Sequence, residues 1–151
     1  MNSHYSSDEI AAAVIDALKL QRMTLQEALK IIERGEQRAA AIGVPMVITV
    51  VDDGGNLVAL HRMDDSLLAS ISISHSKAYT AAALRLSTEE AAKTILPGQP
   101  LYGLQQTHPD RFCIFGGGIP LMQNGRCIGA VGVSGGSVEQ DIDVAKCAAG
   151  L

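Results

Sequence analysis

Residues 116–137 read GGGIPLMQNGRCIGAVGVSGGS, and this stretch is the strongest indication of the fold in the sequence. Within it the pair Asn124-Gly125 separates two apolar runs, 119–122 and 127–133. Asn-Gly is the preferred pair for a type I′ turn, which requires a positive φ at both central residues. The stretch therefore predicts a hairpin of two buried β-strands.

The glycines of this stretch are more numerous than a hairpin needs. Eight of the chain's 15 glycines lie here, and the predicted turn requires only Gly125. The others indicate a backbone that another element, or a flat ligand, approaches closely. At the exit, Ser137 and Gln140 fit a capping box for a final helix over 138–149. Because the glycines match neither phosphate-binding pattern, we interpret the exit as a tight turn into a capped helix.

Composition bounds the class of protein. The 151 residues suit one domain, and 47% hydrophobic with 19% charged residues is typical of a globular protein. A net charge of −4 and scattered basic residues argue against a nucleic-acid partner. The sequence shows neither an 18-residue apolar run nor a secretory leader, which predicts a cytoplasmic protein that does not enter membranes. Three cysteines without CxxC spacing are expected as reduced, packed thiols: Cys113, Cys127 and Cys147.

Upstream of the hairpin, helices and strands alternate. Thr24-Leu25-Gln26-Glu27 and Ser87-Thr88-Glu89-Glu90 are capping boxes, which predict a helix beginning at each. Two apolar runs flank a polar, glycine-containing turn and predict a second hairpin. The expected elements are helices 24–42, 67–86 and 88–96 and strands 46–51, 57–62 and 112–115. The aperiodic segment 99–111 predicts a long surface loop, either functional or an oligomer contact.

Residues 1–23 are expected to form an N-terminal helical extension. Ser6-Ser7-Asp8-Glu9 fits a capping box, and the residues after it place one apolar stripe on a helix: Ile10, Ala13, Val14, Ala17 and Leu18. A helix of about a dozen residues is marginal alone, so it must dock on another surface. One interpretation is packing on its own domain or a neighbouring subunit. The other is targeting, because the helix resembles the encapsulation peptides that direct enzymes into bacterial microcompartments.

One histidine stands out among the residues able to carry chemistry. His75 lies on the expected helix 67–86, on an otherwise apolar face with Ile71 and Tyr79, while Lys77 points elsewhere. A lone histidine on such a face is more often a hydrogen-bonded core or interface residue than a ligand. His61 and His108 add no diagnostic metal-site spacing. The chain carries no HExxH, GxSxG or CxxCH pattern, so no catalytic site is assembled from motifs alone.

Several separated motifs, in order, resemble the GlcG/HbpS family. They are residues 45–52, the pair Asp52 and Gly55, the run Arg62-Met63-Asp64, residues 77–81, and the glycine-rich hairpin followed by Asp141. The family includes the C-terminal domain of the corrinoid adenosyltransferase PduO and open reading frames near diol and glycerol dehydratase operons. The resemblance covers residues 24–151, which we expect to form a single domain.

The resemblance implies a fold and a ligand. The fold is an α/β (α+β) sandwich with a mainly antiparallel five-stranded sheet, helices on both faces, a profilin-like arrangement and homo-oligomers. The ligand is non-covalent haem. The axial ligand is not transferable residue by residue. Haem iron accepts His, Met or Tyr, which leaves four candidates: His75, His61, Tyr79 and Met63. We favour His75 as the axial ligand and His61 as the second candidate.

Three functions follow as hypotheses. The first is a non-enzymatic protein that binds haem or another tetrapyrrole, such as a corrinoid, and supports B12-dependent diol or glycerol metabolism. In this hypothesis residues 1–20 contact a microcompartment shell or dehydratase-system proteins. The second is an enzyme acting on a small organic acid or cofactor in a polar pocket of Lys77, Arg62 and Asp141. The third is an oligomeric assembly or chaperone subunit. We favour a binding protein over an enzyme.

Overall fold

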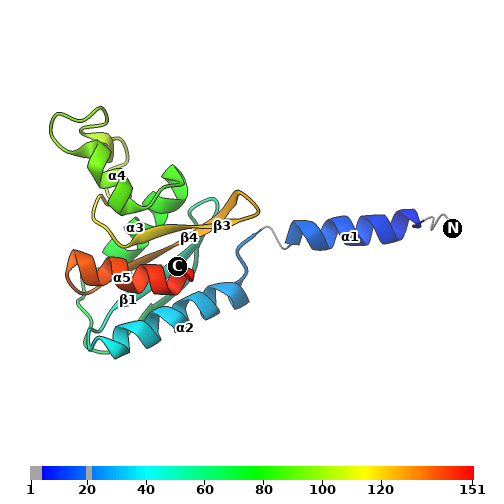
Figure 1. Ribbon diagram of the computed structural model, residues 1–151, viewed down its shortest axis with the longest axis horizontal. Coiled ribbons are helices and arrows are strands. Elements are labelled where there is room, and N and C mark those ends of the chain that lie inside the picture. The colour runs from blue at the N-terminus through cyan, green and yellow to red at the C-terminus, as the bar shows by residue number, and fades with distance from the viewer. Residues whose placement is uncertain (1–4, 20–21) are drawn as a thin grey trace.

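The computed structural model describes residues 5–19 and 22–151, and in them an antiparallel sheet is combined with helices on both of its faces (Figure 1). The elements in chain order are α1 (Ser7–Lys19), α2 (Leu25–Ala41), β1 (Val47–Asp52), β2 (Leu57–Arg62), α3 (Ser70–Leu84), α4 (Thr88–Ile95), the 3₁₀ turn η1 (Leu104–Thr107), β3 (Gly118–Gln123), β4 (Arg126–Ser134) and α5 (Val138–Ala149).

The glycine-rich stretch forms the predicted hairpin. β3 and β4 pair antiparallel, and Asn124 and Gly125 between them have φ of 50° and 76°, as a type I′ turn requires. The order of strands is β2-β1-β4-β3, so β1 and β4 are central. β1 is buried along nearly its whole length, which is why its sequence is apolar without alternation.

The described sheet has four strands, and the prediction of a fifth over residues 112–115 is wrong. This segment runs against α3 instead of pairing with a strand. The backbone N–H of Cys113 donates to the side-chain hydroxyl of Thr80 on α3, at 2.8 Å. This apolar run therefore forms a connection and not a strand, and the Thr80 hydroxyl supplies the hydrogen bond that its buried residue, Cys113, needs.

Two layers of helix cover the sheet. α2 and α5 pack together on one face, where Ile48 and Val50 of β1 join the larger core cluster. α3 covers the other face, where Val51 packs with Ala78 and Thr49 shares a 2.8 Å hydrogen bond with Ser74. Alternate residues of β1 thus serve opposite cores, as the pleat requires.

Glycine is needed where α3 crosses the sheet. A Cβ on Gly132 of β4 would overlap the carbonyl oxygen of Ser74 and lie 2.5 Å from the backbone nitrogen of Ala78. The approaching element that the surplus glycines predicted is therefore α3. Because the helix backbone lies this close, the buried side of α3 must carry small or polar residues, including Ser70, Ser74, Ala78 and Ala81.

The limits of α3 differ from the prediction. The helix runs over Ser70–Leu84, shorter than the expected 67–86, and Leu67 before it is 63% exposed. α2, α4 and α5 begin at the predicted caps: the hydroxyls of Thr24, Ser87 and Ser137 each accept from the N–H three residues on.

α1 forms with the predicted capping box. Ser6 N–H donates to Glu9 Oε2 at 2.7 Å, and Glu9 N–H donates to Ser6 Oγ at 3.2 Å. The helix projects from the α/β body, and residues 5–17 are all exposed (Figure 1). Residues 1–4 and 20–21 of the expected extension lie outside the described residues. The stripe residues Ile10, Ala13, Val14 and Ala17 are thus exposed to solvent and do not pack on the domain.

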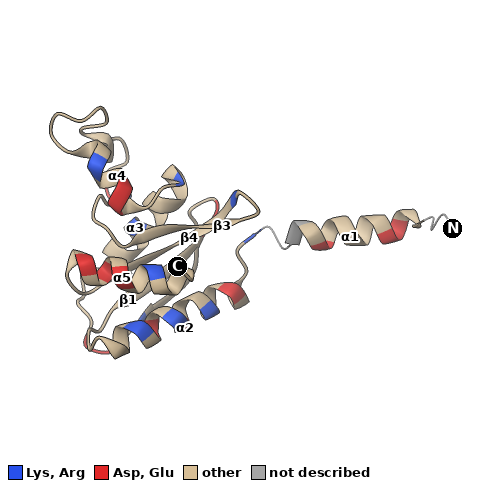
Figure 2. Ribbon diagram, viewed as in Figure 1, with Lys and Arg blue, Asp and Glu red and all other residues tan. Residues whose placement is uncertain are grey.

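Three further features can be compared with the sequence predictions: the spread of basic residues, the state of the cysteines and the character of the helices. Lys and Arg are spread over α2, α4, α5 and the hairpin (Figure 2). All three cysteines are free, and burial raises the pKa of the Cys113 thiol. No helix in residues 5–19 or 22–151 has the length and apolar character needed to cross a membrane.

Candidate functional site

α3 presents two sets of candidate residues on different sides. His75 and Tyr79 lie one turn apart and are half-buried. Lys77 points from another side of the helix into the interior, where its side chain is 2% exposed. The expectation that Lys77 faces away from His75 is confirmed, because the two occupy different sides of the same helix.

The imidazole of His75 has one buried nitrogen, although the residue as a whole is half-buried. Its Nε2 is buried and has no hydrogen-bond partner among the described residues. Burial, with a smaller effect of the Arg111 charge, lowers the pKa of His75 below its usual value. The lowered pKa favours the neutral ring, whose unprotonated nitrogen can serve as a metal ligand.

A cluster of planar side chains lies beside His75. The Arg111 guanidinium carbon is 4.3 Å from the centroid of the Tyr79 ring, within the range of a cation–π contact. Phe112 lies 6.0 Å from Tyr79 and stacks on His108 at 4.5 Å, centroid to centroid. Gly55 in the turn between β1 and β2 makes room for Tyr79, since a Cβ there would lie 2.6 Å from the ring. Sequence reasoning missed Arg111, because the loop that carries it has no periodicity, and it placed Phe112 in a strand that does not form.

Lys77 and Asp141 form a buried ion pair. Lys77 Nζ donates to Asp141 Oδ2 at 2.6 Å and to the carbonyl of Val133 at 3.0 Å. Asp141 Oδ1 accepts the N–H of Gly136 at 3.0 Å, and its side chain is 6% exposed. The pair joins α3, β4 and α5. Each charge is satisfied by the other, so the arrangement is that of a structural clamp.

The remaining candidates lie on or just after β2. His61 Nδ1 is 2.9 Å from Glu36 Oε1 of α2, so His61 lies on the face of the sheet opposite α3. Arg62 is exposed. Met63 packs against the larger core cluster, and its sulfur accepts the N–H of Met46 at 3.4 Å. The structure therefore groups His75 with Tyr79 and Lys77 with Asp141, and it keeps His61 apart from both.

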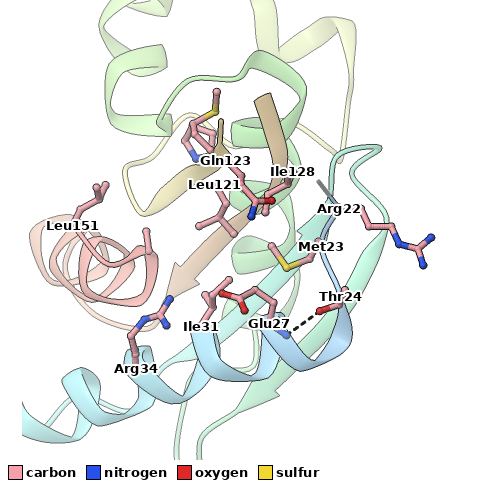
Figure 3. A pocket seen from close by; sticks show the side chains of 13 residues that line it. Arg22, Met23, Thr24, Glu27, Ile31, Arg34, Leu121, Gln123, Ile128 and Leu151 are labelled. Atoms are coloured by element: carbon pink, nitrogen blue, oxygen red, sulfur yellow. Dashed lines mark hydrogen bonds between the residues drawn. The ribbon is translucent and has the colours of Figure 1, made fainter. Parts of the chain in front are cut away.

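A pocket of about 470 Å³ opens on the other side of the molecule (Figure 3). Met23, Ile31, Leu121 and Ile128 supply apolar lining, and Arg22, Glu27 and Arg34 add charge. Arg34 is already engaged, because it donates to the carbonyl of Ala148 at the end of α5. Across the described residues, no group of three or more His, Cys, Asp or Glu side chains is placed to hold a metal ion.

Comparison with protein families and sequences gives concordant matches. A family model described as haem degrading protein HbpS-like matches residues 23–150. The chain is 49% identical over 130 residues to an uncharacterized 15.0 kDa protein from the dhaT-dhaS intergenic region of Citrobacter freundii, covering 86% of this chain and 92% of that protein. It is 39% identical over 126 residues to the corrinoid adenosyltransferase PduO of C. freundii, covering 83% of this chain but 38% of PduO. This chain thus spans little more than a third of that enzyme's length.

Solved structures match closely as well. The crystal structure of the Klebsiella pneumoniae protein ORFY superposes with a TM-score of 0.84 at 41% identity, covering 99% of this chain and 94% of that one. The crystal structure of a PduOC:heme complex superposes with a TM-score of 0.82 at 36% identity, covering 85% of this chain and 94% of that one. The predicted family resemblance is confirmed, and the fold is that of these proteins.

Proposed function

This chain belongs to the HbpS-like family, and we propose that it binds haem non-covalently with His75 as the axial ligand of the iron. The observation that carries the proposal is the buried Nε2 of His75, which lacks a partner among the described residues. A polar atom buried without a hydrogen bond is costly, so its retention calls for a role. Haem iron is a partner that an imidazole nitrogen can take.

The surroundings of His75 fit a haem better than a bare metal ion. Haem supplies the equatorial ligands of its own iron, so the protein needs to add only one axial nitrogen. His75 stands on the helix without a neighbouring carboxylate or thiolate ligand cluster in the part of the chain that the structure describes. The lowered pKa of His75 favours the neutral imidazole, which is the form that ligates iron.

The other proposed ligands are less available. His61 is engaged with Glu36, and the sulfur of Met63 is turned toward the backbone of Met46. Tyr79 is enclosed by Gly55, Arg111 and Phe112. His75 combines a free nitrogen with a neutral ring, so it remains the favoured ligand. The relative PduOC has been crystallised as a heme complex, which supports the same class of ligand here.

Haemin titration tests this proposal. We expect saturable binding with a shifted Soret band in the wild-type protein, and loss of that shift or at least a tenfold weaker affinity in His75→Ala. His61→Ala is the matched control and should bind as the wild type does. A parallel titration with cobalamin tests the corrinoid alternative. If His75→Ala and wild type bind haemin equally, His75 is not the ligand.

The enzyme hypothesis finds less support in the geometry. Lys77 and Asp141 neutralise each other in the interior, and Arg62 is exposed at the end of β2. A catalytic pocket would need these side chains to face a common space. The family description nevertheless names haem degradation, so the stability of the complex matters. We expect the Soret band to persist on incubation with ascorbate in air; its decay with release of iron would favour a degrading enzyme.

The physiological setting is proposed from α1 and from the relatives. The relative PduO is a corrinoid adenosyltransferase, which supports a corrinoid-related setting, and we propose B12-dependent diol or glycerol metabolism as that setting. α1 exposes Ile10 and Val14 by 54% and 51%, so it can dock on a microcompartment shell or a dehydratase-system protein. Val14→Asp should abolish co-localisation of a tagged chain with microcompartments, whereas Ala12→Asp, on the opposite side of α1, should not. Equal localisation of the two variants would exclude a targeting stripe.

Self-association is proposed from the body of the protein. Three large apolar side chains of the body are mostly exposed: Leu67 by 63%, Leu68 by 79% and Tyr102 by 67%. Apolar side chains that gather on a surface mark an interaction site. A homo-oligomer would cover them. Light scattering of the wild type and of Leu68→Glu tests this, with a smaller mass expected for the variant. An unchanged mass in the variant would show that Leu68 lies outside any interface.

A further inference from the structure

We propose that residues 108–112 form a gate over His75, and that Arg111 is the positioning residue that holds the gate closed. A ligand then reaches the imidazole only after this segment leaves α3. The inference rests on the proposed role of His75 and adds how that site is opened and controlled.

The first observation is that His75 is closed off on the outer side of its helix. The inner side of α3 packs on the sheet through Ser70, Ser74 and Ala78. His75 lies off this side and is half-buried as a residue, yet its Nε2 atom is buried. An axial bond from this nitrogen to a haem iron would therefore require the residues that enclose it to move.

The second observation is the set of contacts between the segment and α3. Arg111 stacks over Tyr79, one turn after His75, and Ser76 Oγ donates to the carbonyl of Asp110 at 3.5 Å. Phe112 approaches Tyr79 and stacks on His108. Residues 108–112 thus follow the same side of α3 that carries His75. Arg111 is close enough that its charge contributes to the lowered pKa of His75.

The third observation is an asymmetry in how the segment is anchored. On its C-terminal side, the Cys113 N–H is fixed by the buried hydroxyl of Thr80 at 2.8 Å. On its N-terminal side, Gly98 and Gly103 have φ of 84° and 88° with open space around each α-carbon. The contacts at Asp110 and Arg111 are a long hydrogen bond and an exposed cation–π pair, both weak. The segment can therefore swing from a fixed end at Cys113, with the glycines absorbing the change in backbone angle.

Arg111 is the contact to remove. Arg111→Ala abolishes the stacking on Tyr79 and removes the nearby charge, and because the position is exposed the substitution should leave the fold intact. Arg111→Lys keeps the charge but not the planar stacking. Arg126→Ala is the matched control, since Arg126 is an exposed arginine that pairs with Asp53 on the β-turns.

Accessibility of His75 gives a readout that needs no haem. Diethylpyrocarbonate modifies neutral imidazoles, and peptide mass spectrometry reports each histidine separately. We expect His75 to react at least tenfold more slowly than His61, which is 45% exposed. Arg111→Ala should accelerate His75 modification several-fold, with Arg111→Lys close behind and Arg126→Ala unchanged. Equal rates at His75 and His61 in the wild type would overturn the gate.

Stopped-flow mixing with haemin gives the second readout. The gate predicts a faster association rate in Arg111→Ala than in wild type or Arg126→Ala. If Arg111→Ala speeds His75 modification while haemin does not bind to any variant, the gate stands and haem binding fails. If haemin binds to wild type and Arg111→Ala at the same rate, the gate fails and the proposed function stands.

Discussion

Replacing Lys77 by Met is the perturbation whose effect the structure defines most sharply. Lys77 and Asp141 are 2% and 6% exposed and lie 2.6 Å apart. Removing the lysine leaves a buried carboxylate with a single partner, the N–H of Gly136. Breaking a buried ion pair in this way costs about 3–5 kcal/mol, because the remaining charge is desolvated without compensation. Met fills a similar volume, so cavity formation adds little.

Urea denaturation followed by circular dichroism measures this effect. For a slope of about 2 kcal/mol per molar urea, the midpoint should fall by roughly 1.5–2.5 M. The double variant Lys77→Met with Asp141→Leu should recover part of this loss, since no unpaired charge remains, although the Gly136 N–H loses its acceptor. Lys93→Ala, which breaks the exposed pair with Glu90, is the control and should leave the midpoint unchanged. A loss below about 1 kcal/mol for Lys77→Met would refute the clamp.

Three further predictions follow from the fold and from His75. Gly132→Ala should destabilise the protein far more than Gly43→Ala in the same urea assay, because the new Cβ at position 132 meets the backbone of α3. At Gly43 the space is open, and the substitution costs only the strain of a positive φ; similar losses for the two variants would contradict the close approach of α3. Burial lowers the pKa of His75 below 6.5, so on acidification the unfolded chain protonates this histidine before the folded protein does. The contribution of the neutral His75 to the free energy of unfolding is therefore complete above about pH 6.5 and is lost as the pH falls toward the pKa of the folded state. His75→Gln should therefore lose less stability than wild type between about pH 7 and pH 5. Deleting residues 1–19 should leave the urea midpoint unchanged, because residues 5–17 are exposed; a lower midpoint would show that α1 docks on the body.

The sequence predicted those elements whose signals are local. Asn124-Gly125 fixes a turn through its own backbone preference, and the caps at Thr24, Ser87 and Ser137 act within one helical turn. β1 is recognisable because a strand covered on both faces is apolar throughout. These signals located the two hairpins and the beginnings of three helices.

Longer-range features were not predictable in the same way. The fifth strand failed because Thr80, far away in the chain, supplies the hydrogen bond that a neighbouring strand would have made. The sheet-facing side of α3 could not be recognised from the sequence, because Gly132 brings the backbones together and buried serines replace the large apolar residues that mark an ordinary core face. Lys77 and Asp141 were named as candidates, but only the fold shows that they bind each other.

The sequence named His75 and Tyr79 as candidates but did not show which side chains surround them. His75 is recognisable as the single imidazole on an otherwise apolar helical face. Arg111 comes from a loop without periodicity and Phe112 from a segment predicted as a strand, and their position beside Tyr79 depends on how this part of the chain folds back on α3. Sequence patterns locate a helix and its faces, whereas what covers a face is decided by tertiary packing.

The most direct test of the central claim is imidazole rescue of His75→Gly. This variant removes the imidazole and leaves a space on α3 that free imidazole fits. We predict that His75→Gly with haemin lacks the wild-type Soret band and that millimolar imidazole restores it, whereas His61→Gly needs no rescue. A His75→Gly complex whose spectrum equals that of the wild type without added imidazole would contradict His75 as the axial ligand.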